Sequence, residues 1–170
     1  MENKKLPLSI VIPCADDVRI KDCIDSIDED VEVIAVLNGP IEEVLNIVDN
    51  RNIKKIKIQE KNLSKALNIG IENALSPNVI LMDSDCRFEK GSIRNLFENM
   101  HAHYIAKGYV VFQSNGFLSK IIAKAREYSY YDTPKPYNPF LGIKKNIKRY
   151  IGGYYFDETI HWTEDADLNS

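Results

Sequence analysis

The chain has 170 residues, of which 44% are hydrophobic and 28% charged, and its formal net charge is −3. This length suits one domain with a single core, and the slightly acidic charge gives no general reason to bind nucleic acid. No window approaches the roughly 20 apolar residues of a membrane span, so membrane association is not indicated. Three widely spaced cysteines, Cys14, Cys23 and Cys86, favour neither a disulfide framework nor a cysteine metal site. We therefore expect a cytoplasmic protein.

The first two thirds of the chain alternate predicted strands with predicted helices. Short segments that are apolar throughout are typical of parallel strands covered on both sides. The strands predicted in this way are residues 6–13, 31–37, 79–82 and 109–112, and residues 53–59, where lysines alternate with isoleucines, are predicted to form an edge strand. Between them, apolar residues three and four positions apart predict helices. This order predicts an α/β fold with a doubly wound, mostly parallel sheet.

The remainder of the chain is less regular. One further helix face is predicted by Leu118, Ile121, Ile122 and Ala125. The prolines of the segment DTPKPYNPF then disfavour regular structure and predict a loop. Residues 150–168 combine a glycine pair, aromatic residues and a dense acidic cluster.

Two carboxylates, Asp83 and Asp85, directly follow the predicted buried strand 79–82. The carboxyl ends of such strands are where open α/β sheets bind ligands. Two anionic side chains held close together repel each other, which favours a cation between them and an anionic substrate group. A divalent ion shared with a substrate phosphate would fit. The structural alternative is an acidic loop that caps a helix.

The order of these motifs resembles that of the large GT-A family of inverting glycosyltransferases that use nucleotide sugars, the family 2-like enzymes. The similarity spans nearly the whole chain. Its segments are LSIVIP, DDVRIKDCIDSI, VEVIAVLNG, NLSKALNIGIENA, VILMDSD and IGGYYFDE followed by TEDADL. The resemblance implies transfer of a sugar from a nucleotide-diphospho-sugar to an acceptor hydroxyl, with inversion and with Mn²⁺ or Mg²⁺. The acceptor could be a saccharide, a lipid-linked group or a protein.

The resemblance also implies roles for individual residues. Asp83 would face the nucleoside ribose, and Asp85 would bind the ion that bridges the diphosphate. Asp165 would be the base that deprotonates the acceptor, with Glu164 beside it raising its pKa by like charge. The residues implied to contact the donor are Pro13, Ala15, Asp17, Asn38, Lys65, Asn68, Asp83 and Ser84. Those implied on the acceptor side are Gly152, Gly153 and Trp162.

Several positions depart from the family pattern. Ala15 stands where an aromatic residue usually stacks on the base, and Asn38 stands where an aspartate is common. Leu67 replaces an arginine near the diphosphate, with Lys65 one turn away. The sequence stops soon after Asp165, whereas the family continues through further acceptor-side structure. We therefore expect one domain, in which residues 1–112 form the nucleotide-sugar and metal half and residues 113–170 an incomplete acceptor half.

Other interpretations of these residues remain open. Asp17 could cap a helix, Asn38 could supply a left-handed turn before Gly39, and Glu164-Asp165 could be the first turn of a helix. Two other functions are a non-catalytic nucleotide-binding module and a sugar nucleotidyltransferase. The second is disfavoured because PCADD lacks the glycine-rich, arginine-containing loop that such enzymes carry after the first strand.

Overall fold

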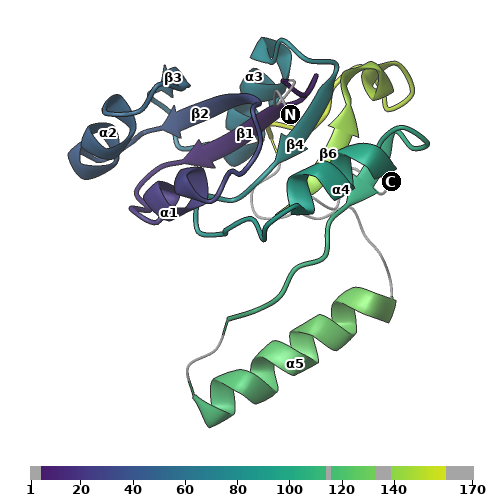
Figure 1. The fold of residues 1–170 in the computed structure, drawn as a ribbon. Coiled ribbons are helices and arrows are strands. Elements are labelled where there is room, and N and C mark those ends of the chain that lie inside the picture. Colours follow the sequence, from purple (N-terminus) through teal and green to yellow (C-terminus); the bar gives the residue numbers. More distant parts are fainter. Residues whose placement is uncertain (1–4, 114–115, 133–138, 160–170) are drawn as a thin grey trace.

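The computed structural model describes residues 5–113, 116–132 and 139–159. Within these ranges six strands form one sheet, in the order β3-β2-β1-β4-β6-β5 (Figure 1). The parallel strands are β1 (Ser9–Cys14), β2 (Glu32–Asn38), β3 (Lys54–Ile58) and β4 (Asn78–Leu81). The antiparallel pairings are made by β5 (Ile105–Lys107) and β6 (Leu141–Lys144). The prediction of an α/β fold with a mostly parallel sheet is confirmed.

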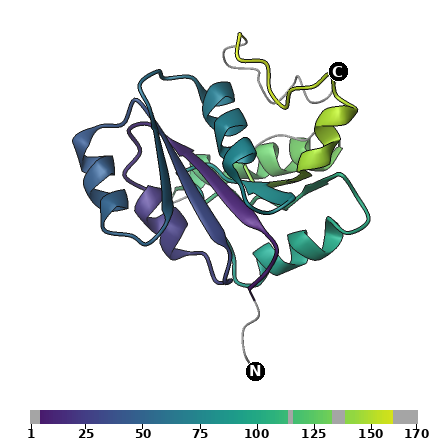
Figure 2. The same ribbon diagram turned by 90° about the horizontal axis from the view of Figure 1, so that it is seen from above.

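Helices cover both faces of this sheet (Figure 2). The helices on one face are α1 (Ile20–Asp25), α2 (Glu42–Asp49) and α4 (Ser92–Asn99), and the other face carries α3 (Leu63–Asn73). Because successive strand residues point to opposite faces, β1 places Ile10 and Ile12 in one layer and Val11 in the other. All three are fully buried. Burying each aliphatic side chain stabilises the fold by about 1.5–3 kcal/mol, which explains why these strands lack polar positions.

Gly70 lets α3 lie directly on the sheet. A Cβ atom at this position would come within 2.3 Å of Val11 Cγ1 and 3.1 Å of Val36 Cγ2. Both valines are fully buried in central strands, so neither can move aside easily. The glycine is therefore required by packing in the middle of a helix where alanine would otherwise be preferred.

We expect Gly70→Ala to lower the free energy of unfolding by about 1–3 kcal/mol, because overpacking outweighs the gain of about 1 kcal/mol in helix propensity. Chemical denaturation followed by circular dichroism would measure this difference. Gly116→Ala is the matched control, since its added Cβ would meet only Ser119 Oγ, at 3.4 Å. A Gly70→Ala protein as stable as the wild type would contradict the packing argument.

The predicted strand 109–112 is wrong. The strand in this region is β5, which ends at Lys107, and residues 108–113 have no regular structure. Tyr109 and Val111 are 53% and 61% exposed, so their apolar alternation faces solvent rather than a layer of helices. The chain leaves the sheet at Gly108, where any Cβ would clash with the ring of Phe140. β4 lies between β1 and β6, and the sequence pattern did not predict β6.

The predicted helix after residue 113 exists as α5 (Phe117–Asp132), but its apolar residues do not pack on the sheet. Leu118, Ile121 and Ile122 are between 52% and 75% exposed. Figure 1 shows α5 lying apart from the sheet. The two ends of this excursion meet, because the Gly108 N–H donates to the Phe140 carbonyl oxygen at 2.9 Å. Across the three described ranges, no helix combines the length and the apolar character that crossing a membrane requires.

Candidate functional site

The carboxylate pair lies where the parallel strands end. The Met82 N–H, one residue beyond β4, still donates to the Val11 carbonyl oxygen of β1 at 3.0 Å. The chain then turns sharply, and the Cys86 N–H donates to the Asp83 carbonyl oxygen at 3.2 Å. This turn holds Asp83 and Asp85 at the carboxyl edge of the sheet, as predicted. The edge is the ligand-binding side of open α/β sheets.

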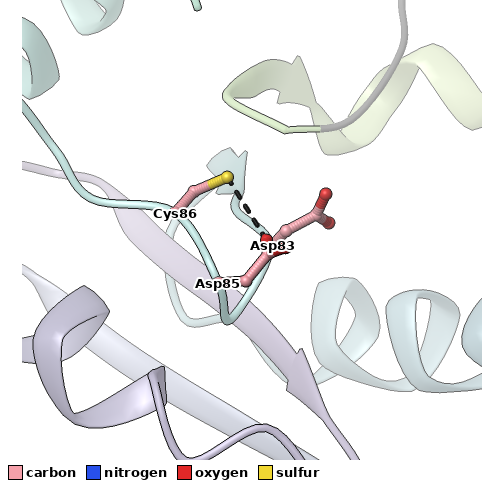
Figure 3. A group of neighbouring side chains, drawn as sticks. All are labelled: Asp83, Asp85 and Cys86. Atoms are coloured by element: carbon pink, nitrogen blue, oxygen red, sulfur yellow. Dashed lines mark hydrogen bonds between the residues drawn. The ribbon is translucent and has the colours of Figure 1, made fainter. Parts of the chain in front are cut away.

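Three side chains of this turn offer ligand atoms to one cation. Asp83, Asp85 and Cys86 each contribute one such atom, and the three atoms lie within 4.8 Å of one another. Figure 3 shows this group, in which the Cys86 thiol donates to Asp85 Oδ1 at 3.4 Å. The Asp85 side chain is 45% exposed, so a ligand can reach it from solvent. Two carboxylates and a thiol form a donor set that first-row divalent cations accept, and the residues therefore fit a metal ion.

The thiols near this turn are held in the neutral form. Burial raises the pKa of the Cys86 thiol to about 12, and the negative charge of Asp85 adds to the effect. Burial likewise raises the pKa of Cys23, whose thiol donates to the Asp83 carbonyl oxygen at 3.5 Å. Burial also raises the pKa of Cys14. Because the thiolate is the reactive form, none of the three is prepared to act as a nucleophile at neutral pH.

Arg19 links the first loop to the carboxylate pair. Its Nε donates to Asp17 Oδ1 at 2.9 Å, and its Nη2 lies 3.5 Å from Asp85 Oδ2. The hydrogen bond with Arg19 holds the pKa of Asp17 below its usual range. The Arg19 side chain is 60% exposed, so these ion pairs add little to stability. Their effect is to place a guanidinium beside Asp85, with Asp17 as its anchor.

Asn38 ends β2 at the same edge of the sheet. The residue is 7% exposed, and its Oδ1 has no hydrogen-bond partner in the part of the chain that the structure describes. The alternative that Asn38 supplies a left-handed turn is wrong, since the left-handed residue is Gly39, with φ of 66°. A buried acceptor without a partner is costly. Asn38 Oδ1 is therefore suited to accept a hydrogen bond from a ligand N–H.

The α3 residues that were predicted to contact the nucleotide sugar form hydrogen bonds with other residues of the protein. Lys65 Nζ donates to Glu60 Oε2 at 2.7 Å. The Asn68 side chain binds the Phe156 backbone twice, through its Nδ2 at 2.8 Å and its Oδ1 at 3.1 Å, and donates to Glu158 at 3.0 Å. Asn62 caps α3 and donates to the Glu158 carbonyl oxygen at 2.9 Å. These contacts hold residues 156–158 at the beginning of α3, on the edge of the sheet where Asp83 lies.

The predicted acceptor-side glycines lie elsewhere. Gly152 and Gly153 have φ of 82° and 90°, and the Gly153 N–H donates to Lys148 in the 3₁₀ helix η1 (Lys145–Arg149). This helix begins beside Pro77, at the opposite end of β4 from Asp83. The structure therefore does not bring these glycines to the carboxylate pair. The predicted residues Trp162, Glu164 and Asp165 lie outside the described ranges.

Residues 9–154 match the family model described as glycosyl transferase family 2. This match covers most of the chain. The chain belongs to glycosyl transferase family 2. A comparison with curated proteins gives no match.

Solved structures share the family 2 fold of this chain. Residues 1–349 of TarS from S. aureus align with a TM-score of 0.67 and 17% identity, covering 94% of this chain and 53% of TarS 1–349. The mannosyltransferase PcManGT from Pyrobaculum calidifontis, solved with GDP-Man and Mn²⁺, aligns with a TM-score of 0.70 and 13% identity. That alignment covers 96% of this chain and 51% of PcManGT. The chain thus spans about half the length of these structures, and at such identities the likeness shows the GT-A fold alone.

Two residues of this family 2 site were missed by sequence reasoning. Arg19 was not considered, although it follows Asp17 by two positions, because its proximity to Asp85 depends on a contact between segments 66 residues apart. Cys86 was considered only as one of three widely spaced cysteines, which do not favour a cysteine metal site. Its position directly after the Asp-x-Asp pair was the available signal, since a turn there places all three side chains together.

Proposed function

We propose that the chain contains the donor-binding half of an inverting glycosyltransferase that takes a sugar from a nucleotide-diphospho-sugar with the help of Mn²⁺ or Mg²⁺. The observation that carries this proposal is the carboxylate pair Asp83 and Asp85 at the carboxyl end of β4, in a chain of glycosyl transferase family 2. Two exposed or half-buried carboxylates on one turn are suited to share a divalent cation with a diphosphate.

Asp85 and Asp83 would hold the ion through their carboxylate oxygens. When bound, the ion would supply Lewis-acid stabilisation of the negative charge that develops on the leaving nucleoside diphosphate. Asn38 Oδ1 would accept a hydrogen bond from the base, which accounts for its lack of a partner in the described residues. Pro13 lies near the carboxyl end of β1, Ala15 follows that strand, and Ser84 lies between the two aspartates; these residues would complete the donor side. Asp17 would act there through Arg19.

The acceptor side of the proposal involves residues beyond those that the structure describes. The acceptor hydroxyl oxygen would form a bond to the anomeric carbon while the bond from that carbon to the diphosphate oxygen breaks. Asp165 would take the hydroxyl proton, with Glu164 beside it. A single displacement of this kind inverts the anomeric centre. We retain residues 113–170 as part of the acceptor half, with Trp162 as a candidate for stacking on a sugar ring.

The solved structures support the donor class. TarS has been solved with UDP-GlcNAc and with UDP, and PcManGT with GDP-Man and Mn²⁺. Both donors are nucleotide-diphospho-sugars, although their bases and sugars differ. They support a nucleotide-diphospho-sugar as the donor class, and the titration below distinguishes the bases.

Calorimetric titration of the chain with UDP and with GDP, each with and without Mn²⁺, tests the donor site. We expect at least one nucleotide to bind, and to bind more tightly with Mn²⁺. The absence of binding to either nucleotide in the presence of the ion would overturn the proposal. Metal-dependent binding by a complete protein that shows no turnover with any donor would instead favour the non-catalytic module.

We expect Asn38→Ala to weaken binding of the preferred nucleoside diphosphate about two- to tenfold, the effect of losing one hydrogen bond. The substitution should not lower the melting temperature through loss of a hydrogen bond to Oδ1, because Oδ1 has no partner in the described residues. Asn99→Ala is the control, since its amide donates to the Asn95 carbonyl oxygen of its own helix, away from the end of β2. Equal nucleotide affinity in all three proteins would remove Asn38 from the donor site.

A further inference from the structure

Cys86 gives the metal-binding turn a sulfur donor. Its thiol hydrogen points to Asp85 Oδ1, and both atoms belong to the group whose ligand atoms lie within 4.8 Å of one another. Oxygen ligands alone suit hard cations such as Mg²⁺, whereas a thiolate favours borderline and soft cations. One sulfur beside two carboxylates should therefore change which ion the site selects.

The geometry of the turn is close to that of a complete site. With metal–sulfur and metal–oxygen bonds of about 2.3 Å and 2.1 Å, two ligands of a tetrahedral ion lie about 3.6 Å apart. The distance from Cys86 Sγ to Asp85 Oδ1 is 3.4 Å, which already matches this edge. Asp83 lies in the same turn, which is closed by the hydrogen bond that the Cys86 N–H donates to the Asp83 carbonyl oxygen.

The other two thiols are committed elsewhere. Cys14 donates to the Asp17 carbonyl oxygen at 3.4 Å and is 3% exposed, while Cys23 donates to the Asp83 carbonyl oxygen and is fully buried. Cys86 is only half-buried, and its thiol donates to a carboxylate rather than to the backbone. A cation that replaced the thiol proton would therefore take over an existing contact between Cys86 and Asp85 without breaking a backbone hydrogen bond.

We propose that Cys86 is a third protein ligand of the metal ion, and that it biases the site toward Co²⁺ and Zn²⁺ over Mg²⁺. This inference rests on the proposed function and deepens it. Binding releases the thiol proton to solvent, and the thiolate forms a bond to the cation. Three protein ligands leave an open position on a four-coordinate ion, which a diphosphate oxygen of the donor can take. A site of two carboxylates alone would not discriminate against Mg²⁺ in this way.

Titration of the metal-free chain with Co²⁺ tests the proposal, because a thiolate ligand produces a charge-transfer absorption band that carboxylates do not. We expect the wild type to develop this band. Cys86→Ser should lose the band and bind Co²⁺ at least about tenfold more weakly, while its affinity for Mg²⁺ stays within about twofold. Cys23→Ala is the control and should keep the band. Cobalt that binds without the band, or a band that persists in Cys86→Ser, would overturn the proposal.

A second measurement uses the wild type alone, in case a variant fails to fold. Bound Zn²⁺ or Co²⁺ should slow alkylation of Cys86, as followed by mass spectrometry, whereas Mg²⁺ at equal occupancy should slow it much less. Equal alkylation with and without saturating Zn²⁺ would overturn the thiolate ligand. The proposed function is tested separately, because nucleoside diphosphate binding that requires Mn²⁺ would stand even if the absorption band and the protection were both absent.

Discussion

Asp85→Asn should abolish the metal-dependent part of nucleoside diphosphate binding while the fold stays intact. The amide keeps the size of the side chain but removes one of two anionic ligands on the turn after β4. Interactions with a charged partner are worth about 1.5–3 kcal/mol each, which corresponds to a loss of at least about tenfold in affinity. Calorimetric titration with Mn²⁺ present would measure the change. Circular dichroism should be unaltered, because the Asp85 side chain is 45% exposed.

Asp49→Asn is the matched control for this experiment. Asp49 ends α2, its side chain is 53% exposed, and it pairs with Lys55 at 3.6 Å, so the change in net charge is the same without touching the turn. The control should bind the nucleotide and the ion as the wild type does. If Asp85→Asn and the wild type bound the nucleotide equally in the presence of Mn²⁺, the assignment of the carboxylate pair would have to be abandoned.

Asp165→Asn, made in a complete and active protein that contains this chain, should lower kcat far more than donor affinity. A general base contributes about 10² to 10⁴ in rate, and the amide keeps the shape of the side chain while losing the ability to accept a proton. In the proposed function, donor binding depends instead on the turn at Asp83–Asp85 and on Asn38. Steady-state kinetics with donor and acceptor varied separately would separate the two effects.

Asp167→Asn is the control for this prediction, since it removes a charge from the same acidic segment two residues away. It should retain most of the turnover. Near-normal turnover in Asp165→Asn would place the base elsewhere, with Glu164 or Asp157 as the next residues to test. The acidic segment would then be interpreted as the first turn of a helix.

The donor half of the fold could be predicted from the sequence because its strands and helices are indicated by patterns within a few consecutive residues. The uniformly apolar residues 79–82 predicted a strand covered on both faces, and Asp83 and Asp85 followed it directly. Gly70 lies on the apolar face of α3, and the close approach of the helix to Val11 explains why this position has no side chain. Each of these inferences needs only a few consecutive residues and one periodicity.

The antiparallel end of the sheet was not accessible, because it depends on pairing between distant segments. The four residues of β6 carry too little pattern to distinguish them from a loop, and their partner β4 lies about 60 residues earlier. Gly142 interrupts the apolar pattern of β6. A glycine is required there because a Cβ atom would come within 2.6 Å of Met100 Sδ. Tyr109–Phe112 had a better strand pattern, but a local pattern does not decide whether a segment pairs with the sheet, and Tyr109 and Val111 face solvent. The ion pair of Arg19 with Asp85 escaped prediction for the same reason.

The hydrogen bond between Gly108 and Phe140 has a consequence for how this protein can change over evolution. Gly108, which follows β5, and Phe140, which precedes β6, are hydrogen-bonded, so the segment between them, which includes α5, begins and ends at one point of the sheet. Doubling the length of such a loop costs only about 0.6 kcal/mol in closure entropy. Insertions, deletions or wholesale exchange of this segment should therefore leave the donor site intact. In the proposed function, exchange of this segment would change the acceptor half while the carboxylate pair at the end of β4 stays unchanged.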